Sequence, residues 1–291
     1  MKIDTQKLLI ASTDTLVENK HFFIGKIKPV QLGRKAVAVA VSDLAAMGSE
    51  PKFILSSIGF NYQLGEIYFK EIIEGFKKAC IEFNVSLVGG NLSGSDTLFI
   101  DITALGQINP DYMVKRSGAE IGDDIYVTGT IGDSALGYKI IDSSVSSKDI
   151  IKKHLEPVPR IEMGKKLSEQ KIVNSMIDVS DGLYLDLSRI TVDFNLGAII
   201  ELEKLPLSKQ YLLTYSEVSD NKFEFAVTGG EDYELLFTAN PEKRELISGL
   251  SLEDGLLITR IGKVTDSGNI LFIDARNDII DFENKGFVHF S

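Results

Sequence analysis

The sequence lacks features that mark several common protein classes. It contains one cysteine, Cys80, so no disulfide can form within the chain, and a reducing compartment is expected. Cys80 lies in a helical pattern beside apolar neighbours, and we interpret it as a core thiol. No apolar run approaches the ~18 residues of a membrane span, and the first residues do not read as a secretory signal. We therefore expect a cytoplasmic protein that is not inserted in a membrane.

Positive charge is also scarce. The chain has 31 Lys and Arg against 42 Asp and Glu, a net charge of -11, and no Lys/Arg-rich run. This balance argues against nucleic-acid binding, because phosphate backbones are held by clustered basic side chains. An acidic protein can still bind an anionic nucleotide when its carboxylates hold Mg2+, which then bridges the phosphate oxygens.

Three familiar motifs are missing as well. The chain has no Walker-type phosphate loop, no kinase His-Arg-Asp motif and no Cys/His metal cluster. Oxygen-ligated magnesium is therefore the cation to consider, and handling of a nucleotide or another phosphate is the expected chemistry.

The length of 291 residues favours two domains. Apolar runs predict strands near residues 8–10, 37–41, 53–58 and 98–105, and an amphipathic helix over 66–83. A short helix is expected at 44–47, started by Ser42 or Asp43 as its N-cap and closed at Gly48. The pattern breaks near Asn109, and we predict domains at 1–112 and 113–291.

The second half is predicted to contain a strand at 125–127, a helix at 134–141, a helix after Pro159, a strand-to-helix turn at 178–183 and a strand at 235–238. Strands alternate with helices in both halves, so each half is an α/β or α+β domain.

Aspartates in three segments are the candidate metal ligands, and we expect each segment to follow a strand. The segments are Thr13-Asp14-Thr15, Ser42-Asp43-Leu44 and Asp178-Val179-Ser180-Asp181-Gly182. Ser and Asp are also preferred N-caps, and capping is favoured for any single Ser-Asp pair. The set as a whole, with the Ser12 and Thr13 hydroxyls beside Asp14, is the oxygen-rich collection that Mg2+ uses.

Glycine turns and histidines give weaker signals. Residues 89–91, 129–132 and 229–231 read as turns that approach a ligand or simply reverse the chain. Of the three histidines, His21 follows Asp14 closely enough to face the same cavity. His154, beside Lys152 and Lys153, is expected at the solvated surface. His21, His154 and His289 are too far apart in the sequence to suggest a catalytic triad.

A set of motifs in a fixed order resembles the thiamine-monophosphate kinase family and spans nearly the whole chain. The matching motifs are Asp14-Thr15-Leu16-Val17-Glu18 with His21-Phe22, Ser42-Asp43-Leu44-Ala45-Ala46-Met47-Gly48, Arg116-Ser117-Gly118-Ala119, Thr128-Gly129 with Gly132-Asp133-Ser134-Ala135, Asp178-Val179-Ser180-Asp181-Gly182-Leu183, Gly230-Glu231-Asp232-Tyr233-Glu234-Leu235, and Gly286-Phe287 with His289-Phe290.

The resemblance implies the two-domain fold shared with aminoimidazole ribonucleotide synthetase: an N-terminal mixed-sheet domain that binds ATP and metal and dimerises, and a C-terminal α/β domain. It implies transfer of the γ-phosphoryl group of ATP to thiamine monophosphate, with Mg2+ as cofactor. By position, the implied metal ligands are Ser12, Thr13, Asp14, Asp43, Asn91, Asp178 and Asp181, of which Asp43, Asp178 and Asp181 are the implied catalytic residues. The implied ATP contacts are Gly90, Asn91, Arg116 and Ser180, and the implied substrate contacts are His21, Glu231 and Phe287.

The reaction requires no strong base, because the acceptor phosphate is already anionic at neutral pH. Positioning and charge neutralisation must supply most of the catalysis. We therefore expect direct in-line transfer without a phosphoenzyme, and no single aspartate is assigned as the base.

Two departures from the family's pattern bear on the ATP site. An upstream Gly-Asp-Asp-Ala segment of the family has no counterpart in the sequence, so the ATP site is expected to be incomplete as written. Gly89-Gly90-Asn91 stands where the family often has Gly-Gly-Asp, and the neutral Asn91 would offset less metal charge.

Other functions remain open on the sequence. The chain could have the function of another ATP-using member of the superfamily, such as aminoimidazole ribonucleotide synthetase, selenophosphate synthetase or the hydrogenase maturation factor. Selenophosphate synthetase is disfavoured, because Cys80 lies in a mid-chain helix rather than near the N-terminus. A non-catalytic nucleotide or thiamine phosphate binding protein is another alternative. A purely structural dimer would require every aspartate segment to serve only as a helix cap.

Overall fold

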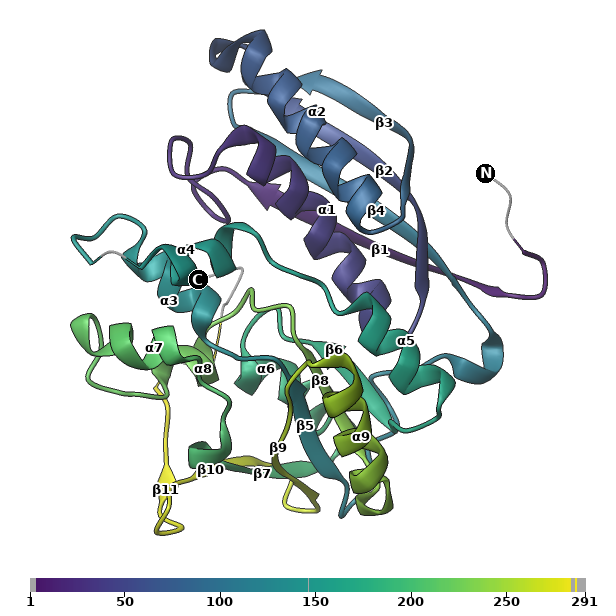
Figure 1. Cartoon of the computed structure of the whole chain (residues 1–291), viewed down its shortest axis with the longest axis vertical. Helices are drawn as coiled ribbons and strands as arrows, with labels where there is room; N and C mark the ends of the chain where they lie inside the picture. Colours follow the sequence, from purple (N-terminus) through teal and green to yellow (C-terminus); the bar gives the residue numbers. More distant parts are fainter. Residues whose placement is uncertain (1–3, 146, 284–285, 287–291) are drawn as a thin grey trace. The chain divides into compact units, whose positions relative to one another are not determined.

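The computed structural model describes residues 4–145, 147–283 and 286, which form two compact units. The first unit reaches to Met113 and also takes in Leu155–Lys166, whereas the second consists of Val114–His154 and the chain from Leu167 onward. Each unit is built on its own mixed β-sheet, as the predicted α/β class requires (Figure 1). The domain limits 1–112 and 113–291 stay a prediction. Within the described residues, no helix is long and apolar enough to cross a membrane.

The first unit contains a four-stranded sheet in the order β1 (Leu8–Val17), β4 (Phe99–Ile108), β2 (Glu50–Phe60), β3 (Ser86–Gly94). β4 is antiparallel to both neighbours, and β2 is parallel to β3. Ile100, Ile102 and Ala104 are buried on one face of β4, whereas Asp101 and Thr103 lie on the other. The strands predicted near 8–10, 53–58 and 98–105 are confirmed in β1, β2 and β4.

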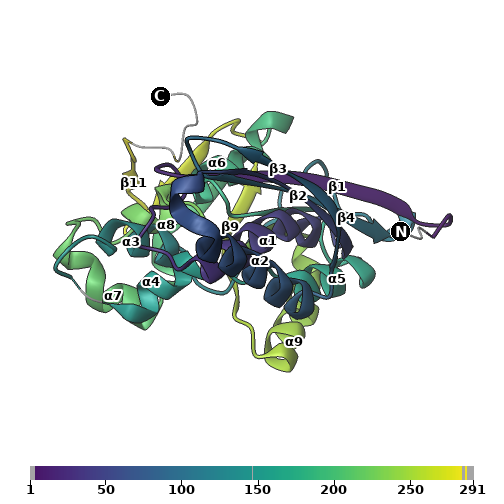
Figure 2. The same ribbon diagram turned by 90° about the horizontal axis from the view of Figure 1, so that it is seen from above.

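Helices α1 (Pro29–Ala46) and α2 (Gly65–Glu82) run side by side along one face of this sheet (Figure 2). α2 is the predicted amphipathic helix. The strand predicted at 37–41 and the short helix at 44–47 are wrong, because both segments belong to α1. Pro29 occupies the first turn, and the Lys28 amide donates to Gln31 Oε1 at 3.1 Å, so the helix begins well before the apolar run.

Residues 36–41 misled the strand prediction because α1 is buried on nearly all sides, and a fully buried helix shows no polar stripe. One side faces the sheet and a second faces α2, where a Cβ on Gly33 would lie 2.2 Å from the Ile72 carbonyl oxygen. A third side meets the first turns of α5 (Ile161–Glu169), where a Cβ on Gly164 would lie 2.1 Å from the Ala45 carbonyl oxygen. Backbone contact at both places depends on glycine.

The second unit contains a seven-stranded sheet in the order β11 (Ile279–Ile280), β10 (Ile270–Ile273), β7 (Gly197–Glu201), β9 (Ile258–Thr265), β5 (Asp124–Thr128), β8 (Leu235–Ala239), β6 (Ser175–Asp178). Only the β10–β7 pair is parallel among the described strands of this sheet. The helices are α3 (Asp133–Ile140), α4 (Lys148–Leu155), α6 (Leu183–Ser188), α7 (Lys209–Thr214), α8 (Glu224–Thr228) and α9 (Arg244–Asp254). The predicted strands at 125–127 and 235–238, the helix at 134–141, the helix after Pro159 and the turn at 178–183 are confirmed.

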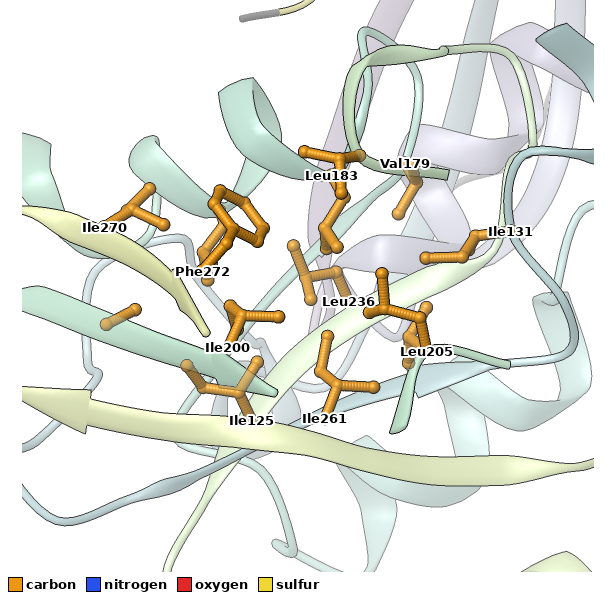
Figure 3. Close-up of a cluster of buried hydrophobic side chains, with 14 of the residues drawn as sticks. Ile125, Ile131, Val179, Leu183, Ile200, Leu205, Leu236, Ile261, Ile270 and Phe272 are labelled. Carbon is orange, nitrogen blue, oxygen red and sulfur yellow. The ribbon is translucent and has the colours of Figure 1, made fainter. Parts of the chain in front are cut away.

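A single large apolar cluster packs the second sheet against its helices (Figure 3). Strand residues Ile200, Leu236 and Ile261 meet Val179 and Leu183, which flank the turn between β6 and α6. All five are almost fully buried. Burying a side chain such as Leu183 stabilises the fold by about 1.5–3 kcal/mol. The apolar residues on either side of the turn therefore hold residues 180–182 in place.

Candidate active site

In the first unit, three predicted metal ligands share the interface between β1 and α1. Ser12 and Asp14 occupy alternate positions of β1, so both side chains point to the face that α1 covers, roughly 7 Å apart along the strand. The Ser12 hydroxyl donates to Asp43 Oδ2 from the last turns of α1. The prediction that these aspartates follow strands is wrong, since Asp14 lies within a strand and Asp43 within a helix. Ser42, likewise inside α1, does not cap a helix.

Thr13 lies on the opposite face of β1 from Ser12. Its hydroxyl is 3.4 Å from each carboxylate oxygen of Asp101 and 3.4 Å from the Thr103 hydroxyl. Thr15, on the same face, donates to Asp101 Oδ2 at 2.6 Å. The expectation that the hydroxyls of Ser12 and Thr13 flank Asp14 together is therefore corrected, because neighbouring strand residues alternate between faces.

Gly90 and Asn91 lie in strand β3 and not in a turn as predicted. Gly90 pairs with Ser56, and a Cβ on Gly90 would lie 2.1 Å from the Ser56 carbonyl oxygen. The Asn91 amide donates to Ser93 Oγ at 3.0 Å. β3 and β1 form opposite edges of the sheet, three strand spacings or roughly 14 Å apart. Within this unit, Asn91 is therefore not grouped with Ser12 and Asp14.

His21 is fixed at the end of β1. Its Nδ1 accepts a hydrogen bond from the Val17 amide at 3.0 Å, and its own amide donates to the Val17 carbonyl at 2.9 Å. Asp14 lies three residues before Val17, roughly 10 Å along the strand. His21 thus lies at the end of the strand that carries Ser12 and Asp14, and the prediction that it faces the same cavity as Asp14 stays a prediction.

In the second unit, the loop between β6 and α6 folds around a buried carboxylate. Oδ2 of Asp186 accepts hydrogen bonds from the amides of Ser180 at 2.9 Å, Asp181 at 2.9 Å and Gly182 at 3.1 Å. Three successive amides converging on one oxygen form an anion-binding concavity. Gly182, with φ +115°, allows the chain to turn there. The amides that precede α6 are thus satisfied by Asp186, and the N-cap position of this helix is Gly182, which has no side chain to cap it.

Arg189 joins the two carboxylates of this loop. It donates at 2.6 Å to Asp186 Oδ1 and at 2.6 Å to Asp181 Oδ2. Burial raises the pKa of Asp186 to about 6, although Arg189 and the amides oppose the shift. The three amide donors and the Arg189 guanidinium favour the ionised form of Asp186, which is the form that the concavity binds. Arg189 thus links Asp181 to Asp186 through its two terminal nitrogens.

The acidic segment 231–234 lies against the same loop. The Glu231 amide donates to the Ser180 carbonyl at 2.8 Å, and the Tyr233 amide donates to the Val179 carbonyl at 2.9 Å. Both residues have positive φ, 65° for Glu231 and 54° for Tyr233, a conformation that is uncommon in residues other than glycine and that these two backbone bonds hold. The predicted turn at 229–231 thus serves to bring this acidic segment beside Asp181.

Each acidic side chain of the segment binds a different element. Asp232 accepts from the amides of Gly132 at 2.6 Å and Ser134 at 3.0 Å at the start of α3, and Glu234 accepts from the Thr128 hydroxyl at 2.6 Å. Burial raises the pKa of Asp232 well above its usual value, and its neighbours Asp133 and Glu234 add to the shift while the two amides oppose it.

Glu231 lies beside His154, with Oε2 3.1 Å from His154 Nδ1. His154 is only 4% exposed, so the prediction of a solvated surface residue is wrong. A usable signal existed in the sequence. His154 follows Ile150 by four residues, which places both on the buried side of α4 despite the lysines between them.

Three predicted site residues remain: Arg116, Asp178 and Phe287. Arg116 is exposed on the loop before β5, next to Lys115, whose carbonyl accepts from the Met176 amide of β6 at 3.1 Å. Asp178 ends β6 and is almost fully buried, as the strand-end prediction requires. Phe287 and His289 lie outside the described residues.

Sequence reasoning missed four residues of the second unit: Asp186, Arg189, Asp232 and His154. Asp186 and Arg189 are three residues apart and one turn beyond Gly182, a helical spacing that brings both side chains back to the loop. Asp232 belongs to a recognised motif but had no role assigned to it.

The chemistry of these residues fits magnesium. Carboxylate and hydroxyl oxygens are its preferred protein ligands, and Mg2+ is usually held by one or two carboxylates together with waters and substrate phosphates. Among the residues that the structure describes, no three His, Cys, Asp or Glu side chains form a ready metal-binding group. The pairs Asp14 with Asp43 and Asp178 with Asp181 are the candidate carboxylates in each unit.

Comparison with known proteins identifies the family. Residues 1–108 match the AIR synthase related protein, N-terminal domain, and residues 120–274 match the corresponding C-terminal domain. A thiamine-monophosphate kinase of Buchnera aphidicola subsp. Acyrthosiphon pisum is 40% identical, over 100% of this chain and 90% of that protein. That of Aquifex aeolicus is 35% identical, over 98% of this chain and 89% of the relative. The chain belongs to the thiamine-monophosphate kinase family.

Solved structures of the family agree with this assignment. AaThiL complexed with AMPPCP and TMP has a TM-score of 0.87 and 32% identity, and the match covers 99% of this chain and 89% of that chain. The predicted resemblance and the two-domain fold shared by the thiamine-monophosphate kinase family are thereby confirmed.

Proposed function

We propose that this chain transfers the γ-phosphoryl group of ATP to thiamine monophosphate, giving thiamine diphosphate and ADP, with Mg2+ as cofactor. The observation that carries the proposal is the loop between β6 and α6. Asp186 satisfies the amides there, so Asp178 and Asp181 are not required as helix caps. Capping was the competing explanation for the Ser180-Asp181 pair, and the Asp186 carboxylate accepts the hydrogen bonds of those amides instead.

The proposed roles follow from side-chain chemistry. In the first unit, Asp43 would bind Mg2+ together with Ser12 and Asp14, and in the second unit Asp178 and Asp181 would bind it. Asp43, Asp178 and Asp181 would be the catalytic carboxylates. Bound Mg2+ would neutralise charge on the reacting phosphates. The Thr13 side chain faces the other side of β1, so its contribution would come from the backbone carbonyl.

Substrate contacts are proposed in the same way. Arg116 and Ser180, with Gly90 and Asn91, are the proposed ATP contacts. His21, Glu231 and Phe287 are the proposed contacts of thiamine monophosphate. The acceptor phosphate is already anionic, so these residues need only align donor and acceptor for direct in-line transfer without a phosphoenzyme.

We propose that the enzyme is a homodimer that associates through the first sheet and acts in the cytoplasm, where ATP is available. β3 is an edge strand whose Leu87, Val88 and Leu92 side chains are exposed. Unpaired edges with apolar side chains favour association. Leu92→Lys would add a charge at this edge, and sedimentation should then show a monomer where the wild type sediments as a dimer. An unchanged mass would exclude this edge from the dimer contact.

The activity test combines purified protein, ATP, Mg2+ and thiamine monophosphate, and follows thiamine diphosphate and ADP by chromatography. Free thiamine serves as the control acceptor. We expect Asp43→Asn and Asp178→Asn to lower kcat by about 100-fold, since each removes a charge that stabilises the transition state. Asp193→Asn, at an exposed position, is the matched control and should turn over as the wild type does. ATP binding without product would refute the kinase proposal and favour a non-catalytic nucleotide-binding protein.

A further inference from the structure

We propose that His154 is a positioning residue that fixes the side chain of Glu231 and thereby sets the affinity for thiamine monophosphate. The inference rests on the proposed function, in which Glu231 contacts that substrate. His154 itself is buried and would act only through Glu231.

The hydrogen-bond geometry defines the protonation of His154. Nδ1 lies 3.1 Å from Glu231 Oε2 and 3.1 Å from the Ser134 hydroxyl. An ionised carboxylate can only accept hydrogen bonds, so Nδ1 must carry the proton. The Nδ1 proton therefore faces two acceptor oxygens at equal distance, one of the Glu231 carboxylate and one of the Ser134 hydroxyl.

The surroundings of the ring leave it little freedom. Tyr138 packs on it with ring centroids 5.3 Å apart. A Cβ on Gly137 would lie 2.5 Å from the Ile150 carbonyl oxygen and 3.3 Å from the His154 Cβ, so α4 lies close to α3 at this point. Ser134 is held in turn, since its amide donates to Asp232 at 3.0 Å. The donor that faces Glu231 is thus fixed by two packed helices.

Glu231 is the partner that benefits from such a fixed donor. Its backbone is held by the Ser180 carbonyl, but a glutamate side chain has several rotatable bonds whose freedom is lost on binding. Its side chain remains 21% exposed and so can still reach a ligand. A carboxylate oriented before the substrate arrives binds more tightly than a mobile one, because less entropy is lost in the complex.

Two amide substitutions separate this role from simple packing. The Asn side-chain nitrogen falls near the position of Nδ1, whereas that of Gln falls near Nε2. We expect His154→Gln to raise KM for thiamine monophosphate by about tenfold, the effect of one lost charged hydrogen bond, with KM for ATP unchanged. His154→Asn should restore KM to within about threefold of wild type, since it retains the donor at the Nδ1 position. Glu231→Gln combined with His154→Gln should add nothing to Glu231→Gln alone, since both act through one contact.

Ile150→Val provides the matched control for lost packing. Ile150 is buried on the same helix in a cluster with Leu136, Ile140 and Tyr211, so this variant should lower the melting temperature and leave KM unchanged. Equal KM changes in His154→Asn, His154→Gln and Ile150→Val would overturn the inference.

A spectroscopic measurement tests the contact without turnover. In protein with 15N-labelled histidine, the His154 signal should show a protonated Nδ1, and Glu231→Gln should shift that signal. A His154 signal with the proton on Nε2 alone would overturn the inference. Wild-type turnover with unchanged KM in His154→Gln would overturn it and leave the kinase proposal standing. A wild type that makes no thiamine diphosphate would overturn both.

Discussion

Thr128→Val is the most direct test of how the acidic segment is held. Thr128 is fully buried in β5, and its hydroxyl makes two hydrogen bonds. It donates to Glu234 Oε2 at 2.6 Å and accepts from the Leu235 amide at 2.8 Å. Valine has nearly the same shape as threonine, so the substitution removes these two bonds without opening a cavity.

The expected loss of stability follows from the two bonds. A hydrogen bond to a charged group contributes about 1.5–3 kcal/mol, and leaving a buried amide without an acceptor costs about 1–3 kcal/mol. Taking the lower part of each range, we expect Thr128→Val to destabilise the second unit by about 3 kcal/mol.

Hydrogen exchange measured by mass spectrometry on the peptide that covers β8 is the assay. A loss of about 3 kcal/mol should accelerate exchange there by about 150-fold. Thr238→Val is the matched control, because Thr238 is also fully buried and its hydroxyl bonds the neutral Ser175 hydroxyl, at 2.8 Å. Its loss of about 1 kcal/mol should accelerate exchange by about fivefold. Equal acceleration in the two variants would refute the argument that the charged partner decides the magnitude.

Three further results are expected. Gly129→Ala should destabilise the fold by at least about 3 kcal/mol, measured by urea unfolding, because its Cβ would lie 2.1 Å from a carboxylate oxygen at φ +57°. Gly255→Ala has a similar φ of +63° in open space and should cost only about 1 kcal/mol, so equal effects would contradict the clash. Because burial raises the pKa of Asp232 in the folded protein, its protonated form contributes stability at low pH that is lost as pH rises through the folded pKa. Asp232→Asn should therefore flatten the decline of unfolding free energy with pH between acid and neutral pH. An unchanged dependence of unfolding free energy on pH would disprove the raised pKa. Gly75→Ala should lower the melting temperature by several degrees because its Cβ would lie 2.2 Å from a carbonyl oxygen of α1, whereas Gly94→Ala, in open space, should not.

The sequence predicts the strands and helices of the second unit more accurately than those of the first. Its strands and helices alternate with polar, glycine-containing turns, and the apolar runs have lengths typical of single elements. The turn at 178–183 is placed correctly because Val179 and Leu183 anchor it on both sides.

The first unit contains an error that periodicity alone cannot prevent. Residues 36–41 alternate valine and alanine, a composition that suits a buried strand and a buried helix equally well. Packing of the whole helix α1 against α2, and of its last turn at Ala45 against Gly164 of α5, decides for the helix, and both partners are distant in sequence. The sequence pattern marks Asp43 as a candidate metal ligand after a strand, whereas its actual placement inside α1 depends on tertiary packing.

For the candidate site, the sequence predicts some residues and misses their contact partners. Motif order predicts which residues matter, because function limits residue type at those positions. It does not predict partners such as Asp186 for the Ser180 amide or His154 for Glu231, since those contacts depend on how a helix turns its faces. His154 was misplaced because the adjacent lysines suggested a solvated helix face.

The bonds of the acidic segment to β5 and α3 join residues about 100 positions apart in the chain. Closing a loop of that length costs about 4 kcal/mol of chain entropy before any contact compensates for it. A ribosome must therefore synthesise the chain beyond Leu235 before this region can acquire its shape, and the part of the protein proposed to recognise substrate should be among the last to order. Chains released early would retain much local helix and strand yet lack this site, which makes them substrates for proteases rather than partially active enzymes.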